Sequence, residues 1–242
     1  MNDPKVSLLW FTGKDTADPQ FYAARMLAYT KNTRLQMTPD GFERFMTMSH
    51  DELEKELEYM SNTIPSSWEF VDVIYSINDV TRACAQQITR TRNASFAMQS
   101  QRVTDMSEVS YHIPDSVKHK DLYQGRLDMA LTGYQFAVQD GESLEDARGL
   151  LPLNVHCNLI AKYNLRSLVD LLRARDSMRV QGEYHMIARE MRRLIIEAWP
   201  WVAPFFVPKD EKAIKLIEEV AGSLDNKELR MQLAKAADLL KK

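Results

Sequence analysis

Three short apolar runs that resemble β-strands lie far apart in this chain of 242 residues, at positions 6–12, 68–77 and 154–163. Long segments between them repeat apolar residues with the period of an α-helix, most clearly at 121–139, where one helix face is apolar throughout. A few separated strands among long helices indicate an α+β fold, with helices packed against a modest sheet. Further helices are expected at 18–29, 51–60 and 79–89, from residue 165 onward, and at 184–198.

Three prolines separate the C-terminal part of the chain from the rest. Pro200, Pro204 and Pro208 interrupt an aromatic segment, because proline lacks a backbone donor and breaks regular helix. Two amphipathic helices are expected after them, at 213–222 and 227–240. These two helices look like an appendage to the preceding domain.

The charge balance limits the kinds of partner. Formal net charge is −3, so no global positive field draws the chain onto nucleic acid, and any anion site must be a local cluster of arginine or lysine. The longest apolar stretches, near 8–11 and 198–207, are far shorter than the ~20 residues of a membrane helix. The N-terminus has no basic segment followed by an apolar one. We expect a cytoplasmic protein with no membrane or nucleic-acid partner.

Cysteine and histidine spacings indicate no metal site. Cys84 and Cys157 form no metal-spaced motif, suit a reducing compartment and are predicted to be packing residues. The histidines also lack ligand spacing, so we predict no bound metal. His156, in the expected strand near residue 160, is interpreted as a structural histidine, and a position near a bound folate is the alternative. The five histidines are His50, His112, His119, His156 and His185.

Arginine and serine gather between residues 90 and 102 without helical spacing. In an extended backbone, residues two apart point to the same side, so Arg90 and Arg92 form one pair of donors. Ser100 and Arg102 form a second pair. Guanidinium groups bind phosphate through two parallel hydrogen bonds, which favours a phosphate-bearing ligand. A solvated basic stretch that pairs with surface carboxylates is the alternative, and spacing alone does not decide between them.

The order Arg90-x-Arg92, seven residues, Ser100, x, Arg102 resembles the signature of flavin-dependent thymidylate synthases. A second block is independent of the first. It resembles the family's second conserved block in order and spacing, and the resemblance spans roughly residues 5–207 when weaker matches are included. The second block consists of Leu151-Pro152-Leu153-Asn154, residues 164–168, Arg175 and Gln181-x-Glu183, and the weaker matches are 23–25, 66–69, Gln87 and the segment near Trp201.

This resemblance implies a fold, an assembly and a site. Family members are homotetramers with a central mixed sheet flanked by helices, and each active site is assembled from several subunits around FAD. The implied domains are an FAD- and nucleotide-binding catalytic domain at 1–208 and a helical extension at 209–242. Arg175 and Asp170 are the candidate catalytic residues. The implied FAD site comprises Ser66, Ser67, Arg90, Arg92, Asn164, Arg166 and Asp170, and the implied nucleotide site comprises Gln87, Ser100, Arg102 and Arg175.

The chemistry that the resemblance implies needs no enzyme nucleophile. Reduced flavin takes the methylene of 5,10-methylenetetrahydrofolate and delivers it to C5 of a pyrimidine deoxynucleoside monophosphate, with NADPH as the expected reductant. The protein contributes orientation and electrostatics. This agrees with the cysteines, neither of which stands in a recognisable catalytic arrangement with a histidine.

Structural roles compete for several of these residues. Asn164 could serve as the N-cap of the helix that starts at Leu165. Arg166 and Arg173 lie four and three residues from Asp170, so helix ion pairs worth about 0.2–0.5 kcal/mol each explain all three without a ligand. Ser167 and Glu183 are expected to be structural.

Departures from the family pattern cluster around the expected flavin and base. The middle histidine of the signature is Thr91, the acidic residue two before the serine is Met98, and the asparagine expected at position 170 is Asp170. Ala97 replaces an asparagine and Val103 an aromatic residue.

Three activities remain open. Water could add to the exocyclic methylene intermediate and yield a 5-hydroxymethyl nucleotide, as for a phage enzyme in the host cytoplasm. The base could be cytosine, because a carboxylate at Asp170 suits its amino donor. The leading form is 5-hydroxymethylation of dCMP (deoxycytidylate hydroxymethylase), and the alternatives are hydroxymethylation of dUMP and conventional conversion of dUMP to dTMP. A nucleotide- or flavin-binding module that has lost catalysis is the non-enzyme alternative.

Overall fold

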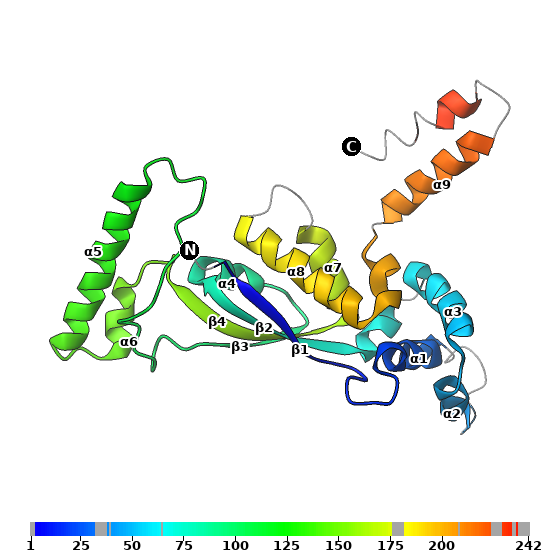
Figure 1. Cartoon of the computed structure of the whole chain (residues 1–242), viewed down its shortest axis with the longest axis horizontal. Helices are drawn as coiled ribbons and strands as arrows, with labels where there is room; N and C mark the ends of the chain where they lie inside the picture. Colours follow the sequence, from blue (N-terminus) through cyan, green and yellow to red (C-terminus); the bar gives the residue numbers. More distant parts are fainter. Residues whose placement is uncertain are drawn as a thin grey trace.

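The described part of the chain is an α+β fold, as the sequence predicts, with a four-stranded sheet at its centre (Figure 1). The strands β1 (Lys5–Phe11), β2 (Asp72–Thr81), β3 (Ala94–Met98) and β4 (His156–Asn164) lie in the order β1-β2-β4-β3. All three strand pairs are antiparallel, so the expectation of a mixed sheet is wrong. The computed structural model describes residues 3–31, 38, 40–63, 65–175, 182–207, 209–223, 229–233 and 236.

Two boundaries around β2 differ from the prediction. Trp68, expected in a strand, lies in the 3-10 helix η2 (Pro65–Phe70), where its Nε1 donates to the carbonyl of Met60 at 3.2 Å. Residues 79–81, expected to open a helix, belong to β2. The side chain of Thr81 caps α4 (Arg82–Ile88), because its Oγ1 accepts a hydrogen bond from the next turn of backbone, and the helix therefore starts one residue later.

The main core lies between the sheet and two helices, α7 (Leu165–Arg175) and α8 (Gly182–Ala198). Alternate side chains of β2 are buried, as expected for a strand with one face on a core. Tyr75 on that face is fully buried, and its hydroxyl donates to the carbonyl of Met191 in α8 at 3.0 Å. The aromatic segment η4 (Pro200–Phe206) follows α8 and belongs to the same core.

Three helices form the opposite end of the molecule from α5 (Figure 1). They are α1 (Pro19–Lys31), α2 (Gly41–Met46) and α3 (His50–Thr63). Asp18 lies directly before α1 and contacts two of these helices. The Asp18 carboxylate accepts from Arg25 Nη1 at 2.6 Å and lies 3.2 Å from His50 Nε2, so it ties α1 to α3.

Helix α5 (Lys120–Gln139) projects from the sheet as an arm (Figure 1). It packs against α6 (Leu144–Ala147) and the 3-10 helix η3 (Arg148–Leu150), with a small core around Tyr134. The predicted apolar face is confirmed, since Leu127, Leu131 and Tyr134 are buried. A second apolar stripe, seven residues apart, is exposed: Leu122 at 63%, Met129 at 75% and Phe136 at 59%.

Helix α9 (Lys209–Ser223) starts earlier than expected and extends away from the sheet (Figure 1). The second expected C-terminal helix, at 227–240, lies largely outside the described residues. No helix in the described ranges is long and apolar enough to span a membrane.

Candidate functional site

The signature residues Arg90 and Arg92 lie in the turn between α4 and β3, and their side chains are exposed. The backbone of Asn93 is left-handed, with φ of 57°, and β3 begins only at Ala94. The expectation that Arg90 and Arg92 share one side of an extended strand is therefore wrong. The turn lies beside the start of α7, because the hydroxyl of Ser167 donates to the Asn93 carbonyl at 3.1 Å.

The start of α7 gathers several residues of the predicted FAD site. Asn164 Oδ1 accepts from the backbone N–H of Ser167 at 2.8 Å, which confirms the N-cap prediction. Arg166 Nη1 lies 2.6 Å from Glu69 in η2, the segment that also carries exposed Ser66 and buried Ser67. The turn that carries Arg90 and Arg92 thus lies beside the N-terminus of α7, an 11-residue helix whose second residue, Arg166, is paired with Glu69. The positive end of the helix dipole favours an anion there.

The predicted ion pairs within α7 are wrong. Arg166 pairs with Glu69 instead of Asp170. Arg173 Nη2 donates to the carbonyls of Phe205 and Val207, at 2.6 and 3.0 Å, and so anchors η4 to α7. Burial lowers the pKa of Arg173, while attraction to Asp170 opposes this shift. Asp170 lies on the exposed face of α7.

Arg175 is the last residue of α7 and lies near other residues that the sequence assigns to the site. Its guanidinium carbon Cζ lies 4.6 Å from the ring centroid of Tyr184, and its carbonyl accepts from His185 Nδ1 at 3.1 Å. Helix α8, which carries Tyr184, packs against α4, which carries half-buried Gln87. The structure therefore brings the ends of α4 and α7 together. Gln181, from the Gln-x-Glu motif, lies outside the described residues.

Ser100 and Arg102 lie in the loop after β3 and are exposed. The backbone N–H of Arg102 donates to Ser100 Oγ at 3.2 Å, which holds the two side chains in one turn. Arg102 Nε lies 2.9 Å from the carboxylate of Glu145, and Arg148 Nη2 lies 3.9 Å from the other oxygen of the same carboxylate. Two guanidinium groups thus surround one anion.

Arg148 is a candidate site residue that the sequence analysis does not name. Its one sequence signal is its position three residues before Leu151, where the second family block begins. Its spatial relation to Arg102 depends on the α5 arm, which brings α6 and η3 back to the loop after β3.

The two groups of arginines lie at opposite ends of β3. The five residues of that strand rise about 3.3 Å each and separate the turn of Arg90 and Arg92 from the turn of Ser100 and Arg102 by roughly 15 Å or more. A single chain does not bring all predicted residues into one pocket.

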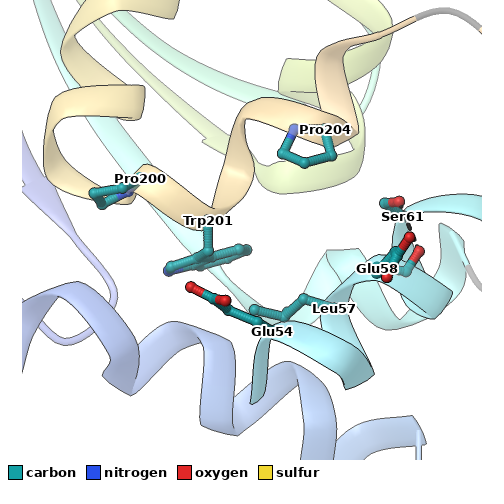
Figure 2. A pocket seen from close by; sticks show the side chains of 7 residues that line it. All are labelled: Glu54, Leu57, Glu58, Ser61, Pro200, Trp201 and Pro204. Atoms are coloured by element: carbon teal, nitrogen blue, oxygen red, sulfur yellow. Dashed lines mark hydrogen bonds between the residues drawn. The ribbon is translucent and has the colours of Figure 1, made fainter. Parts of the chain in front are cut away.

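A cavity of about 480 Å³ between α3 and η4 holds none of the predicted residues (Figure 2). Figure 2 shows Trp201 facing Leu57 and Glu54 of α3, with a proline on each side of it along η4. Two carboxylates in its lining oppose the binding of a phosphate. The lining consists of Glu54, Leu57, Glu58, Ser61, Pro200, Trp201 and Pro204.

Several polar groups near the sheet are buried. Glu183 accepts from the backbone N–H and the hydroxyl of Thr81, at 2.7 and 2.6 Å, which agrees with its predicted role. His156 is buried and its Nδ1 is hydrogen-bonded to Ser110 Oγ at 2.8 Å, whereas its Nε2 is buried and has no partner among the described residues. Burial raises the pKa of the thiols of Cys84 and Cys157, so both are poor nucleophiles.

Known proteins are similar to the chain over most of its length. Residues 14–201 match the family described as "Thymidylate synthase complementing protein". A flavin-dependent thymidylate synthase of Nitratidesulfovibrio vulgaris is 28% identical over 214 residues, which is 82% of this chain and 84% of that protein. The enzyme of the same name from Pyrococcus furiosus is 32% identical over 158 residues, 62% of this chain and 65% of that protein. The one from Geobacter sulfurreducens is 30% identical over 133 residues, 52% and 57% of the two chains.

These matches define the class of protein as a flavin-dependent one-carbon transferase that acts on a deoxynucleotide. The chain belongs to the thymidylate synthase complementing protein family. The resemblance inferred from residues 90–102 and from the second block is thereby confirmed at the level of the family.

Proposed function

We propose that this chain binds FAD and transfers a one-carbon unit from 5,10-methylenetetrahydrofolate to C5 of a pyrimidine deoxynucleoside monophosphate. The observation that carries the nucleotide part is the pair Arg102 and Arg148 around the Glu145 carboxylate. Exposed guanidinium groups that already share one carboxylate have the spacing and charge to share a phosphate. Ser100 Oγ, hydrogen-bonded to the same turn, adds a neutral donor.

The residues at the start of α7 fit FAD. Arg90, Arg92 and Arg166 would supply positive charge to the FAD pyrophosphate near the N-terminus of α7. Ser66 and Ser67 supply hydroxyl donors from η2, and Asn164 keeps its amide beside the helix start. Bound FAD supplies the redox and carbon-transfer chemistry. The chain's own side chains bind, orient and screen the reacting groups, with NADPH as the reductant.

The leading proposed product remains 5-hydroxymethyl-dCMP. Conversion of dUMP to dTMP is supported equally, because the relatives are named flavin-dependent thymidylate synthases. The placement of Asp170 makes the cytosine proposal specific. Five residues along a helix correspond to a rotation of about 140°, so Asp170 and Arg175 of one chain face different directions. A base read by Asp170 must therefore bind on the exposed face of α7.

We also propose that the active enzyme is a homotetramer whose sites combine residues of several copies. Two observations support shared sites. The arginines proposed to bind FAD and those proposed to bind the nucleotide phosphate lie at opposite ends of β3. In addition, an apolar stripe of Leu122, Met129 and Phe136 is exposed on α5. Large apolar side chains that are aligned and exposed on one helix face are candidates for contact with another copy. The cytoplasm, or the host cytoplasm for a phage gene, is the proposed location, and residues 1–208 are the proposed catalytic domain.

One experiment tests the product directly. The purified protein, with FAD, NADPH and methylenetetrahydrofolate, is incubated with dUMP or dCMP in ordinary or oxygen-18 water, and the nucleotides are analysed by mass spectrometry. A product that carries a hydroxymethyl group with solvent oxygen supports the leading proposal. Methylated dUMP alone assigns conventional thymidylate synthesis, and no turnover of either nucleotide contradicts the proposed activity.

A further inference from the structure

Tyr184 occupies an unusual position beside Arg175. Its side chain is 1% exposed, and its ring lies under the guanidinium of Arg175, with 4.6 Å between Cζ and the ring centroid. A ring in this position attracts the cation and restricts the arginine to few rotamers. Arg175 is also held at its backbone, because its carbonyl accepts from His185 Nδ1. The end of α7 is thus held by two consecutive residues of α8.

The hydroxyl of Tyr184 is the second observation. It is buried and forms no hydrogen bond of normal geometry with any described residue, and its polar neighbours are Thr91 and Arg175. Burial raises the pKa of this phenol, although Thr91 and Arg175 partly oppose the shift, so the hydroxyl keeps its proton at neutral pH. Buried hydroxyl groups without a partner are rare in native proteins, because each forfeits its hydrogen bonds to water. The hydroxyl of Tyr184 thus keeps a donor that no described acceptor satisfies.

The third observation comes from the sequence. Thr91 stands where the family signature has a histidine, so the chain lacks an imidazole at this point. Tyr184 reaches the same point from α8, a different element, and places its hydroxyl near Thr91.

We propose that Tyr184 is a positioning and specificity residue of the nucleotide and flavin site. Its ring orients Arg175, and its hydroxyl donates a hydrogen bond to the ligand near Thr91, the position at which the family signature has a histidine. This inference rests on the proposed function and on the assignment of Arg175 to the nucleotide site. It extends that function to a residue outside both sequence blocks.

The test uses the full-length protein with FAD and compares four variants. Arg175→Ala establishes whether Arg175 serves the site. Tyr184→Phe removes the hydroxyl and keeps the ring, and Tyr184→Leu removes both. Tyr75→Phe is the matched control, because Tyr75 is an equally buried tyrosine whose hydroxyl donates to the Met191 carbonyl instead. The measurements are bound FAD by absorbance, dUMP and dCMP affinity by calorimetry, and the separate kcat and KM of turnover.

The loss of ligand affinity is expected to differ among the variants. Tyr184→Phe weakens nucleotide or FAD binding about tenfold, the usual effect of one lost hydrogen bond to a ligand. Tyr184→Leu approaches the loss seen in Arg175→Ala, and Tyr75→Phe leaves binding unchanged. Adding Thr91→His to Tyr184→Phe restores part of the lost affinity, an outcome that a purely structural role of Tyr184 does not produce.

The outcomes separate the two proposals. If the unmodified protein binds neither nucleotide nor FAD, the proposed function fails. If it binds both and Arg175→Ala weakens binding, but neither Tyr184→Phe nor Tyr184→Leu does, the proposed function stands and the inference about Tyr184 is overturned. If circular dichroism shows that Tyr184→Leu does not fold, the test rests on Tyr184→Phe and on the double variant Tyr184→Phe with Thr91→His. Unchanged ligand binding in Tyr184→Phe then overturns the inference.

Discussion

Arg102→Ala should weaken the binding of a nucleoside monophosphate and leave the binding of the corresponding nucleoside unchanged. In the free protein, the Arg102 guanidinium lies 2.9 Å from Glu145, and 62% of its side chain is exposed. A hydrogen bond to a charged group contributes about 1.5–3 kcal/mol, which corresponds to roughly 10- to 150-fold in affinity. Because Arg102 is so exposed in the single chain, solvent screening favours the lower end, about tenfold.

Glu145→Gln should act in the opposite direction. The carboxylate of Glu145 competes with phosphate for Arg102 and Arg148, and an exposed ion pair is worth about 0.2–1 kcal/mol. Removing its charge should therefore raise nucleotide affinity by up to about fivefold. The two variants together test whether the ligand replaces Glu145.

The assay is calorimetric titration with dUMP, dCMP and their nucleosides at two salt concentrations. Arg193→Ala is a matched control, since Arg193 is an exposed arginine of α8 that pairs with Glu190 and Glu197, each at 2.8 Å. Unchanged dUMP and dCMP affinity in Arg102→Ala, or equal losses for nucleotide and nucleoside, would refute the phosphate assignment.

Three further predictions concern stability, pH and assembly. Glu183→Ala should lower the free energy of unfolding by about 2–4 kcal/mol, because it removes a buried acceptor from two donors of Thr81. A denaturant melt in which the variant is as stable as the unmodified protein would contradict this. Burial lowers the pKa of His156, so the folded state binds its proton less readily than the unfolded chain; stability is complete above the unfolded pKa of about 6.5 and falls as pH drops below it. His156→Gln should therefore flatten the loss of stability between about pH 7 and pH 5, and urea melts across that range measure it. Met129→Glu with Phe136→Glu should yield a smaller, still folded species on a sizing column, whereas an unchanged elution volume would remove α5 from the proposed interface.

The sequence alone determined the elements and the family. Helical and strand periods depend on neighbours a few residues apart. The α+β class, the apolar face of α5 and the Asn164 cap could therefore be predicted from short stretches of sequence. The spacing of Arg90, Arg92, Ser100 and Arg102 identified the family without any structure. Errors occurred where a local pattern admits two partners. Arg166 and Arg173 have a carboxylate at helix spacing, yet their stronger partners come from η2 and η4.

The tertiary structure decided which residues meet. Arg102 and Arg148 share Glu145 only because the α5 arm folds back on the loop after β3. Tyr184 reaches Arg175 and Thr91 only because α8 packs against both α4 and the end of α7. Strand direction likewise depends on how distant segments pair, and here all three pairs are antiparallel. Such contacts join residues far apart in the chain, and their energy comes from burial and pairing that a local sequence window does not contain.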